Sequence, residues 1–274
     1  MKLAFERIEG AEPAWAIAFL HGILGQGSNL QTLARRFVGQ HPTWTAWLVD
    51  LRGHGNSPKG TPDASLEAVA RDIVALAANN ALPVAAIAGH SFGGKVALEV
   101  ARLEGIPSLS DVVVIDSTPG AREPLRGADS ALGIIATLES LPDTFASITE
   151  FVAELERSGL SRQVAQWLAG SLERNGNRLR FGLDLNEIRT LLLDYFVRDL
   201  WPVVENPTGE TRLQLVIGDR SDSYSPADRE RALRIAASNP QVTVDVLPAG
   251  HWVHMDNLEG LLRVMNVGPR SSLT

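Results

Sequence analysis

The chain of 274 residues contains no cysteine. Disulfide bonds, thiolate catalysis and cysteine-ligated metal sites are therefore excluded. Long hydrophobic runs are missing as well, and none approaches the ~18 residues of a membrane-spanning helix, so we expect no stable membrane insertion. The first residues, "MKLAFERIEG", place Glu6 and Arg7 where a signal peptide would need its apolar core. The absence of cysteine does not decide the compartment, but the N-terminal pattern and the short apolar runs predict a cytoplasmic protein.

Runs of basic residues are also missing. The chain has 25 Lys and Arg against 32 Asp and Glu, which gives a net charge of −7 and argues against a nucleic-acid-binding surface. The six histidines lack ligand spacing such as H-E-x-x-H, so we expect no metal site. What the chain does have is an ordinary globular composition, 45% hydrophobic, and enough length to bury a large core as a monomer or a homodimer.

Short apolar runs rich in β-formers recur along the chain. Most are nearly continuous rather than alternating, which is typical of strands buried on both faces. Helical patterns such as 65–79 and 93–105 lie between several of them, and this alternation predicts a doubly wound, mostly parallel sheet with right-handed crossovers. Residues 2–9 fit an antiparallel edge strand. The expected parallel strands are 14–20, 45–50, 83–89, 111–116, 213–218 and 242–247.

The alternation stops between residues 120 and 208, where the pattern is helical throughout. We interpret 120–208 as a helical cap, and 1–119 with 209–274 as one α/β core. Such an insertion can simply cover the sheet, or it can be a lid that shapes a substrate pocket. We favour the lid.

The stretch "AGHSFGG" (88–94) follows a predicted strand and opens a predicted helix. This is G-x-S-x-G in the strand–turn–helix context that a nucleophile elbow requires. Gly89 and Gly93 are needed because the chain turns too tightly there for a Cβ. The elbow would lift the Ser91 hydroxyl above the carboxyl edge of the sheet, beside the positive end of a helix. We therefore predict Ser91 as the nucleophile.

A glycine-rich loop, "FLHGILGQGSN" (19–29), follows the first buried strand. Acyl transfer needs backbone N–H groups directed at the oxyanion of the tetrahedral intermediate. One would come from Phe92, the residue after the nucleophile. We expect the other from Ile23, with Leu24 as the alternative, and we expect His21 to brace the loop.

The general base is expected late in the chain, in "LPAGHWVHMDN" (247–257). His251 follows the last predicted strand, from where its imidazole could reach Ser91 and take its proton. His254 is the rival. We interpret His54, in "LVDLRGHGNSP", as structural, and His41 as exposed.

These motifs together resemble an α/β-hydrolase of the capped esterase type. The matching stretches are "HGILG", "DLRGHGNS", "GHSFGG" and "AGHWVH", which span both halves of the core. The resemblance extends to a subgroup of small bacterial esterases and thioesterases and their mitochondrial relatives, through "VVVIDSTP", "RFGLDLNEI" and "GDRSDSY". It implies the α/β-hydrolase fold and a catalytic triad in the chain order Ser, Asp, His.

The position of the acid is less obvious. Many α/β-hydrolases carry it three residues after a glycine, in the loop that follows the penultimate strand. The glycine here is Gly218, and three residues on lies Ser221; Asp219 comes too early and Asp222 one residue late. Asp222 stays a candidate because a loop could absorb that shift.

Asp116 is the competing acid, at the carboxyl end of "DVVVID". A charged group that ends a buried strand needs a partner such as an imidazolium. In the resembled subgroup the acid lies at this position. We therefore predict Asp116, with Asp222 as the alternative.

The combined prediction is a serine hydrolase that cleaves a carboxylic ester or thioester through an acyl-enzyme, without a cofactor. The apolar residues of the lid predict a small-molecule substrate with an apolar acyl part. A carbon–carbon bond hydrolase or lyase is the alternative, because it uses the same triad; it would need cations such as Arg122, Arg126 or Arg180 for a substrate carboxylate. A non-catalytic ligand receptor is the remaining alternative.

Overall fold

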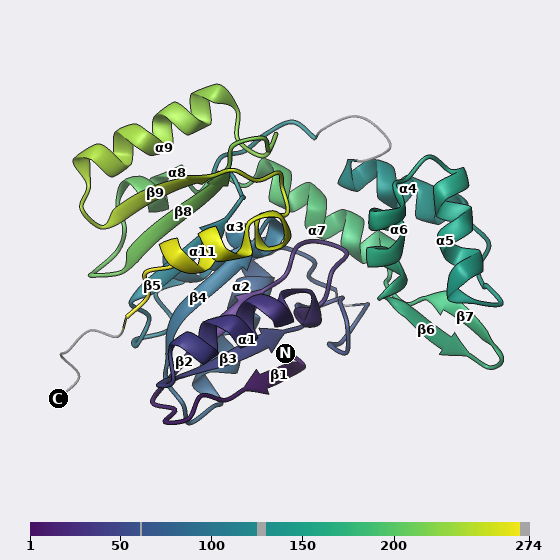
Figure 1. The fold of residues 1–274 in the computed structure, drawn as a ribbon, viewed down its shortest axis with the longest axis horizontal. Helices are drawn as coiled ribbons and strands as arrows, with labels where there is room; N and C mark the ends of the chain where they lie inside the picture. The colour runs from purple at the N-terminus through teal and green to yellow at the C-terminus, as the bar shows by residue number, and fades with distance from the viewer. Residues whose placement is uncertain (61, 125–129, 269–274) are drawn as a thin grey trace.

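The structure is a computed structural model that describes residues 1–60, 62–124 and 130–268. Arg126 lies outside these ranges. The centre of the protein is a seven-stranded sheet in the order β1-β3-β2-β4-β5-β8-β9 (Figure 1). β1 is antiparallel to β3, and the other neighbours are parallel. The strands are β1 Phe5–Ile8, β2 Trp15–Leu20, β3 Trp44–Val49, β4 Val84–His90, β5 Asp111–Ile115, β8 Arg212–Gly218 and β9 Val242–Leu247. The predicted mostly parallel sheet and its antiparallel edge are confirmed.

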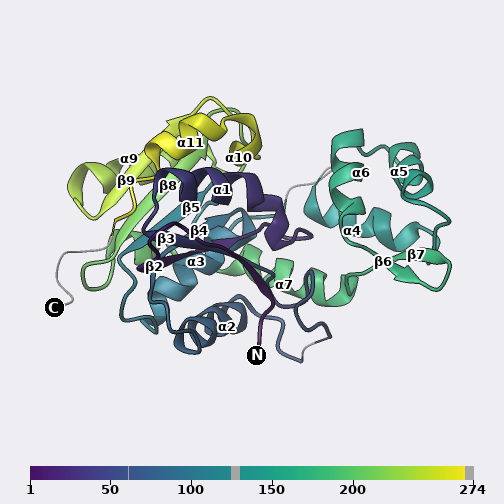
Figure 2. The same ribbon diagram turned by 60° about the horizontal axis from the view of Figure 1, so that its bottom comes forward.

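Helices cover both faces of this sheet, as the apolar character of its strands requires. Figure 2 shows α1 (Gln31–Gln40) and α11 (Leu258–Val264) above the sheet, and α2 (Leu66–Ala78) and α3 (Phe92–Leu103) below it. Each face has its own apolar cluster: Phe37 and Leu261 belong to one, and Ile73 and Val96 to the other. The remaining core elements are η1 Gly27–Leu30, α8 Trp201–Glu205, α9 Pro226–Ser238 and α10 Val253–Asp256. No described helix has both the length and the apolarity needed to cross a bilayer.

A second lobe is inserted between β5 and β8, and Figure 1 shows it set apart from the core. Helix α7 leads from this lobe back to the sheet. α8 follows within the same insertion, and its Val203 and Val204 are buried in the core cluster. The insertion thus supplies both the lobe and part of the covering of the sheet. Its lobe elements are α4 Ala131–Ser140, α5 Ile148–Arg157, α6 Arg162–Ala169, β6 Leu172–Asn175, β7 Arg178–Phe181 and α7 Leu185–Val197.

The expectation of helix throughout the insertion was wrong at residues 172–181. β6 and β7 form an antiparallel hairpin there, in which Asn175 pairs with Arg178. The two-residue loop between them begins at Gly176, whose φ of 63° suits a tight hairpin turn. A further bridge joins β7 to Phe145, so the hairpin is tied to the helical part of the lobe.

Lys95 joins the core to the two segments by which the chain enters and leaves the insertion. It lies on α3 and has no exposed surface. Its ammonium donates to the carbonyl of Gly120 (2.8 Å), where the chain leaves the core, and to those of Tyr195 (2.7 Å) and Arg198 (2.9 Å), where it returns. All three protons of the ammonium therefore have backbone acceptors, which offsets part of the cost of burying its charge, although burial still lowers the pKa of Lys95 to about 7.

We predict that Lys95→Met lowers the free energy of unfolding by roughly 2–4 kcal/mol, because it leaves buried carbonyls without donors. Urea denaturation followed by circular dichroism measures this. Lys59→Met is the matched control: Lys59 also joins core to insertion, through Glu173, but both side chains are partly exposed. The control should change the free energy of unfolding by less than about 1 kcal/mol. Equal losses in the two variants would contradict the role of Lys95 in joining the insertion to the core.

Candidate active site

Ser91 lies in a backbone turn that the neighbouring glycines make possible. β4 ends at His90 and α3 begins at Phe92, so Ser91 alone forms the elbow, with a φ of 52°. A Cβ on Gly89 would lie 2.0 Å from the carbonyl oxygen of Gly93, and a Cβ on Gly93 would lie 2.4 Å from that of Leu20. Only glycine fits at either position, which is the physical reason for the motif.

The structure brings three of the predicted site residues into one hydrogen-bonded chain. His251 Nε2 lies 3.1 Å from Ser91 Oγ, and His251 Nδ1 lies 2.6 Å from Asp116 Oδ2. They come from the β4–α3 elbow, the loop after β9 and the end of β5, which meet at the carboxyl edge of the parallel sheet. This geometry can move a proton from the hydroxyl to the imidazole while a carboxylate orients the ring.

Asp116 has no exposed surface, and its carboxylate is surrounded by donors. The Gly218 N–H donates to Oδ1 at 2.9 Å, and the Ser221 hydroxyl donates to Oδ2 at 2.5 Å. Together with His251 these bonds offset the loss of solvation that a buried carboxylate suffers.

The loop after β8 supports the site, as its sequence suggested, through two serines whose roles the sequence did not predict. Ser221, at the position where many relatives of this fold carry the acid, donates to Asp116 instead. Ser223 Oγ lies 2.8 Å from His251 Nδ1. Asp222 between them is exposed and lines the cavity, and no bond joins it to His251 in the described structure. One feature of the sequence indicates this role: three residues after Gly218, where an aspartate is expected, the chain has Ser221.

The two predicted oxyanion alternatives differ in their hydrogen bonding. The Leu24 N–H donates to His54 Nε2 at 3.2 Å and is therefore occupied. For the N–H groups of Ile23 and Phe92, the described residues include no hydrogen-bond acceptor. A Cβ on Gly22 would lie 3.4 Å from the Ser91 Cβ, so this loop runs directly beside the nucleophile. The geometry favours Ile23 with Phe92.

Two buried histidines brace this loop. His21 Nε2 accepts from the Leu51 N–H at 3.0 Å, and His54 Nδ1 lies 2.8 Å from the Arg52 carbonyl. Burial lowers the pKa of His21 to about 4 and that of His54 to about 3. Both rings are therefore neutral at pH 7, and each has one nitrogen that accepts and one that donates.

His90 and His254 lie next to His251 but do not replace it. His90 Nε2 is 2.9 Å from the His251 carbonyl, and its ring lies 4.8 Å from that of His251 and 4.6 Å from that of His254. Burial lowers the pKa of His90 well below its ordinary value and that of His254 to about 4. His251, and not its rival His254, is the imidazole bonded to Ser91.

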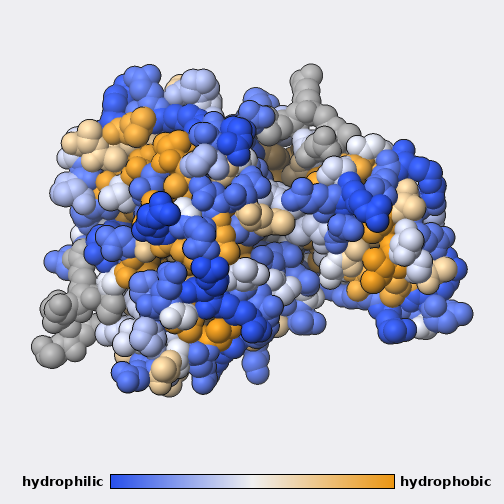
Figure 3. Space-filling model, viewed as in Figure 1, coloured by the Kyte–Doolittle hydropathy of each residue, from blue (hydrophilic) through white to orange (hydrophobic). Residues whose placement is uncertain are grey.

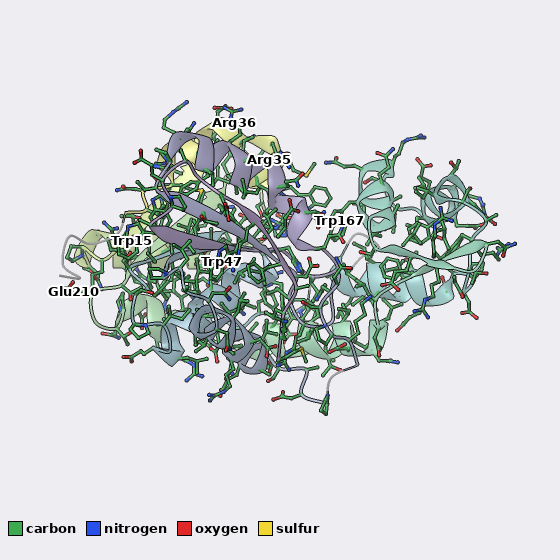
Figure 4. The ribbon with its side chains drawn as sticks, turned by 90° about the horizontal axis from the view of Figure 1, so that it is seen from below. Trp15, Arg35, Arg36, Trp47, Trp167 and Glu210 are labelled. Carbon is green, nitrogen blue, oxygen red and sulfur yellow. The ribbon has the colours of Figure 1, made fainter. Side chains whose placement is uncertain are left out.

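A cavity of about 910 Å³ opens above Ser91, between the core and the insertion. Figure 3 shows the recess between the two lobes. The lining of the 910 Å³ cavity includes Ser91, His251, Ile23 and Phe92, together with apolar side chains of the insertion. A smaller hollow of about 340 Å³ lies at the opposite edge of the sheet beside Trp15 and Glu210 (Figure 4), away from these groups. The described residues contain no cluster of three or more potential metal ligands.

Comparison with known proteins agrees with this geometry. Residues 17–264 match the model of the alpha/beta hydrolase family. The chain belongs to this family. It is a serine hydrolase, and the fold expected from its motifs is confirmed. It is 29% identical to the sn-1-specific diacylglycerol lipase ABHD11 of Mus musculus, over 93% of this chain and 81% of that protein.

A bacterial relative and a solved structure extend the likeness. The chain is 27% identical to esterase YbfF of Escherichia coli, over 91% of each chain. A marine microorganism esterase superimposes with a TM-score of 0.78 and 24% identity, covering 96% of this chain and 97% of that one. The predicted resemblance to small bacterial esterases is thereby confirmed.

Because burial lowers the pKa values of several histidines, we predict that the protein loses stability in mild acid. Below the unfolded-state pKa of 6.5 the unfolded chain takes up protons at these rings, whereas folded His21 and His54 stay neutral down to about pH 4 and 3. The unfolded state then binds more protons, so stability falls as pH falls, by up to about 1.4 kcal/mol per pH unit for each ring. Urea unfolding between pH 7.5 and 5 measures the slope.

We expect a slope of nearly two protons per molecule near pH 5.5 from His21 and His54, and a larger one once the buried His90 and His254 are included. His54→Asn should lower it by about one proton, whereas His41→Asn should lower it less, because His41 is only half-buried. A slope below one proton in the unmodified chain would contradict this account.

Proposed function

We propose that the chain hydrolyses a carboxylic ester or thioester through an acyl-enzyme formed on Ser91. The observation that carries this proposal is the hydrogen-bonded chain from Ser91 through His251 to buried Asp116, beside the Ile23 and Phe92 N–H groups, which have no acceptor among the described residues. Relatives named as a lipase and an esterase support an ester as the substrate class. We also propose the cytoplasm as its location and residues 120–208 as a lid over the core.

In the first step His251 Nε2 takes the Ser91 proton as Oγ attacks the carbonyl carbon. The N–H groups of Ile23 and Phe92 stabilise the oxyanion, helped by the amino end of α3. Asp116 stabilises the imidazolium that forms. His251 then protonates the leaving group, which departs and leaves the acyl group on Ser91. Water, activated by the same imidazole, releases the acid and restores the hydroxyl.

The histidines around His251 favour this cycle. Because burial keeps His90 and His254 neutral at pH 7, neither neighbouring ring adds a positive charge beside the imidazolium. The full positive charge therefore develops only on the ring that Asp116 contacts.

One observation favours a second candidate, hydrolysis or lysis of a carbon–carbon bond. Arg122 lines the cavity, and its buried Nε has no hydrogen-bond partner among the described residues. Such a cation could hold a substrate carboxylate. Arg180 is exposed beside Glu173 on the hairpin and does not line the cavity. Arg122→Met would abolish turnover of a vinylogous diketone acid while sparing neutral esters, if this candidate were correct.

We predict that Asp116→Asn lowers turnover of p-nitrophenyl butyrate by roughly 10⁴-fold, because the wrong imidazole tautomer then faces Ser91. Asp222→Asn, the matched control, should stay within about threefold of the unmodified enzyme. Initial rates at saturating ester measure both. The reverse ranking would move the acid to Asp222.

We predict that Ser91→Ala removes the burst of p-nitrophenol that acyl-enzyme formation produces. Stopped-flow absorbance at enzyme concentrations near that of the ester measures the burst. A burst that persists in Ser91→Ala would contradict the nucleophile, and wild-type protein that turns over no ester would favour the receptor alternative.

A further inference from the structure

The walls of the cavity above Ser91 come from two separate groups of elements. One wall comes from the helices α4 and α7, through Ile134, Leu192 and Phe196. The other comes from the start of α1, from α6 and from the segment after His251, through Leu33, Trp167, Trp252 and Met255. In Figure 2, α1, α6 and α10 lie in the upper half of the view and α7 in the lower half. Since an ester has two arms, the two walls raise the question of which arm each one receives.

The second wall is closed by an aromatic contact between the lid and the core. The Trp167 ring on α6 lies 5.4 Å from the Trp252 ring, at 60°. Trp167 Nε1 also lies 3.4 Å from the Oδ1 of Asn29, in η1. Figure 4 shows Trp167 on the side of the lid that faces the core. Trp167 therefore touches both the segment after the base and the segment beside the oxyanion loop.

The direction of proton transfer decides between the walls. His251 Nε2 must protonate the leaving-group oxygen, so the leaving arm lies on the His251 side of the carbonyl carbon. Trp252 directly follows His251 in the chain, and Met255 lies one helical turn further on. The carbonyl oxygen points at the Ile23 and Phe92 N–H groups.

The acyl arm takes the remaining direction, toward the wall of α4 and α7. The Phe92 ring lies 5.9 Å from that of Tyr195 on α7, so this wall begins directly beside the oxyanion donors. An acyl chain bound there would extend over Leu192 and Ile134. The wall for the leaving arm thus adjoins His251, and the wall for the acyl arm adjoins the oxyanion donor Phe92.

We propose that Trp167 and Trp252 determine specificity for the leaving group, and that the preferred substrates carry a large apolar alcohol or thiol part. This inference rests on the proposed esterase function. Two indole rings and a methionine provide apolar area and ring stacking for such a group. Met255 is 55% exposed, so a long leaving group can continue past it into solvent.

Two pairs of esters separate the arms. Phenyl acetate and 2-naphthyl acetate share an acyl group and have leaving groups of similar basicity but different size. Phenyl acetate and phenyl hexanoate share a leaving group and differ in the acyl chain. The ratio of kcat/KM within each pair cancels effects of a variant on the catalytic groups themselves.

Trp252→Ala and Trp167→Ala should lower the naphthyl-to-phenyl ratio by about tenfold, the size expected for a lost aromatic contact. They should leave the hexanoate-to-acetate ratio within twofold of the unmodified enzyme. Leu192→Ala, on the opposite wall, is the matched control and should show the reverse pattern. Trp167→Ala carries the test by itself if Trp252→Ala fails to fold.

The assignment is overturned if the tryptophan variants change the hexanoate-to-acetate ratio and leave the naphthyl-to-phenyl ratio unchanged. It is also overturned if neither ratio moves in a variant that melts within a few degrees of the unmodified enzyme. In both cases the unmodified enzyme still hydrolyses esters in a Ser91-dependent manner, so the proposed function stands. Absence of ester turnover in the unmodified enzyme would instead remove both.

Discussion

The contact between the Asp116 carboxylate and the His251 imidazole is the constraint around which the rest of the site is arranged. A carboxylate with no exposed surface is stable only where donors replace its water. β8 and the loop after it supply two of them, from Gly218 and Ser221, and His251 supplies the third. The same bonds that stabilise the charge also fix the ring, whose other nitrogen lies 3.1 Å from Ser91 Oγ, the direction of proton transfer in the proposed mechanism.

The remaining buried histidines serve this arrangement by staying uncharged. His21 and His54 connect the oxyanion loop to the segment after β3 through bonds that only neutral rings can make, since each ring accepts at Nε2. The bond from the Leu24 N–H to His54 also occupies the alternative to Ile23, whose own N–H has no acceptor among the described residues. In the proposed mechanism, a ring that braces the backbone thus determines which amide of this loop can bind the oxyanion.

Much of this arrangement was predictable from local sequence. The mostly parallel sheet follows from buried apolar runs separated by helices, and Gly89 and Gly93 mark the elbow because no other residue fits there. The hairpin of β6 and β7 was not predicted, since four-residue strands with polar ends give almost no periodic signal and Gly176 resembles any helix end. The roles of Ser221 and Ser223 were not predictable either, because they depend on how one loop packs against residues about 100 positions earlier or 28 positions later.

Two helices of the insertion that line the cavity, α7 and α6, are attached to the core by different kinds of contact, and this difference agrees with the proposed order of an acyl-enzyme reaction. The end of α7 is held by Lys95 and by the Arg198–Glu99 ion pair, in which Glu99 is fully buried. Helix α6 and the residues just after it meet the core through the ring contact of Trp167 with Trp252 and through two long bonds, from Trp167 to Asn29 and from Ser171 to the Leu24 carbonyl. Breaking the buried hydrogen bonds and ion pair at α7 costs more free energy than separating two half-buried rings. In the proposed reaction the arm that leaves first would therefore face the side held by α6, whose contacts separate more readily, while the acyl group on Ser91 would face α7, which is held in place.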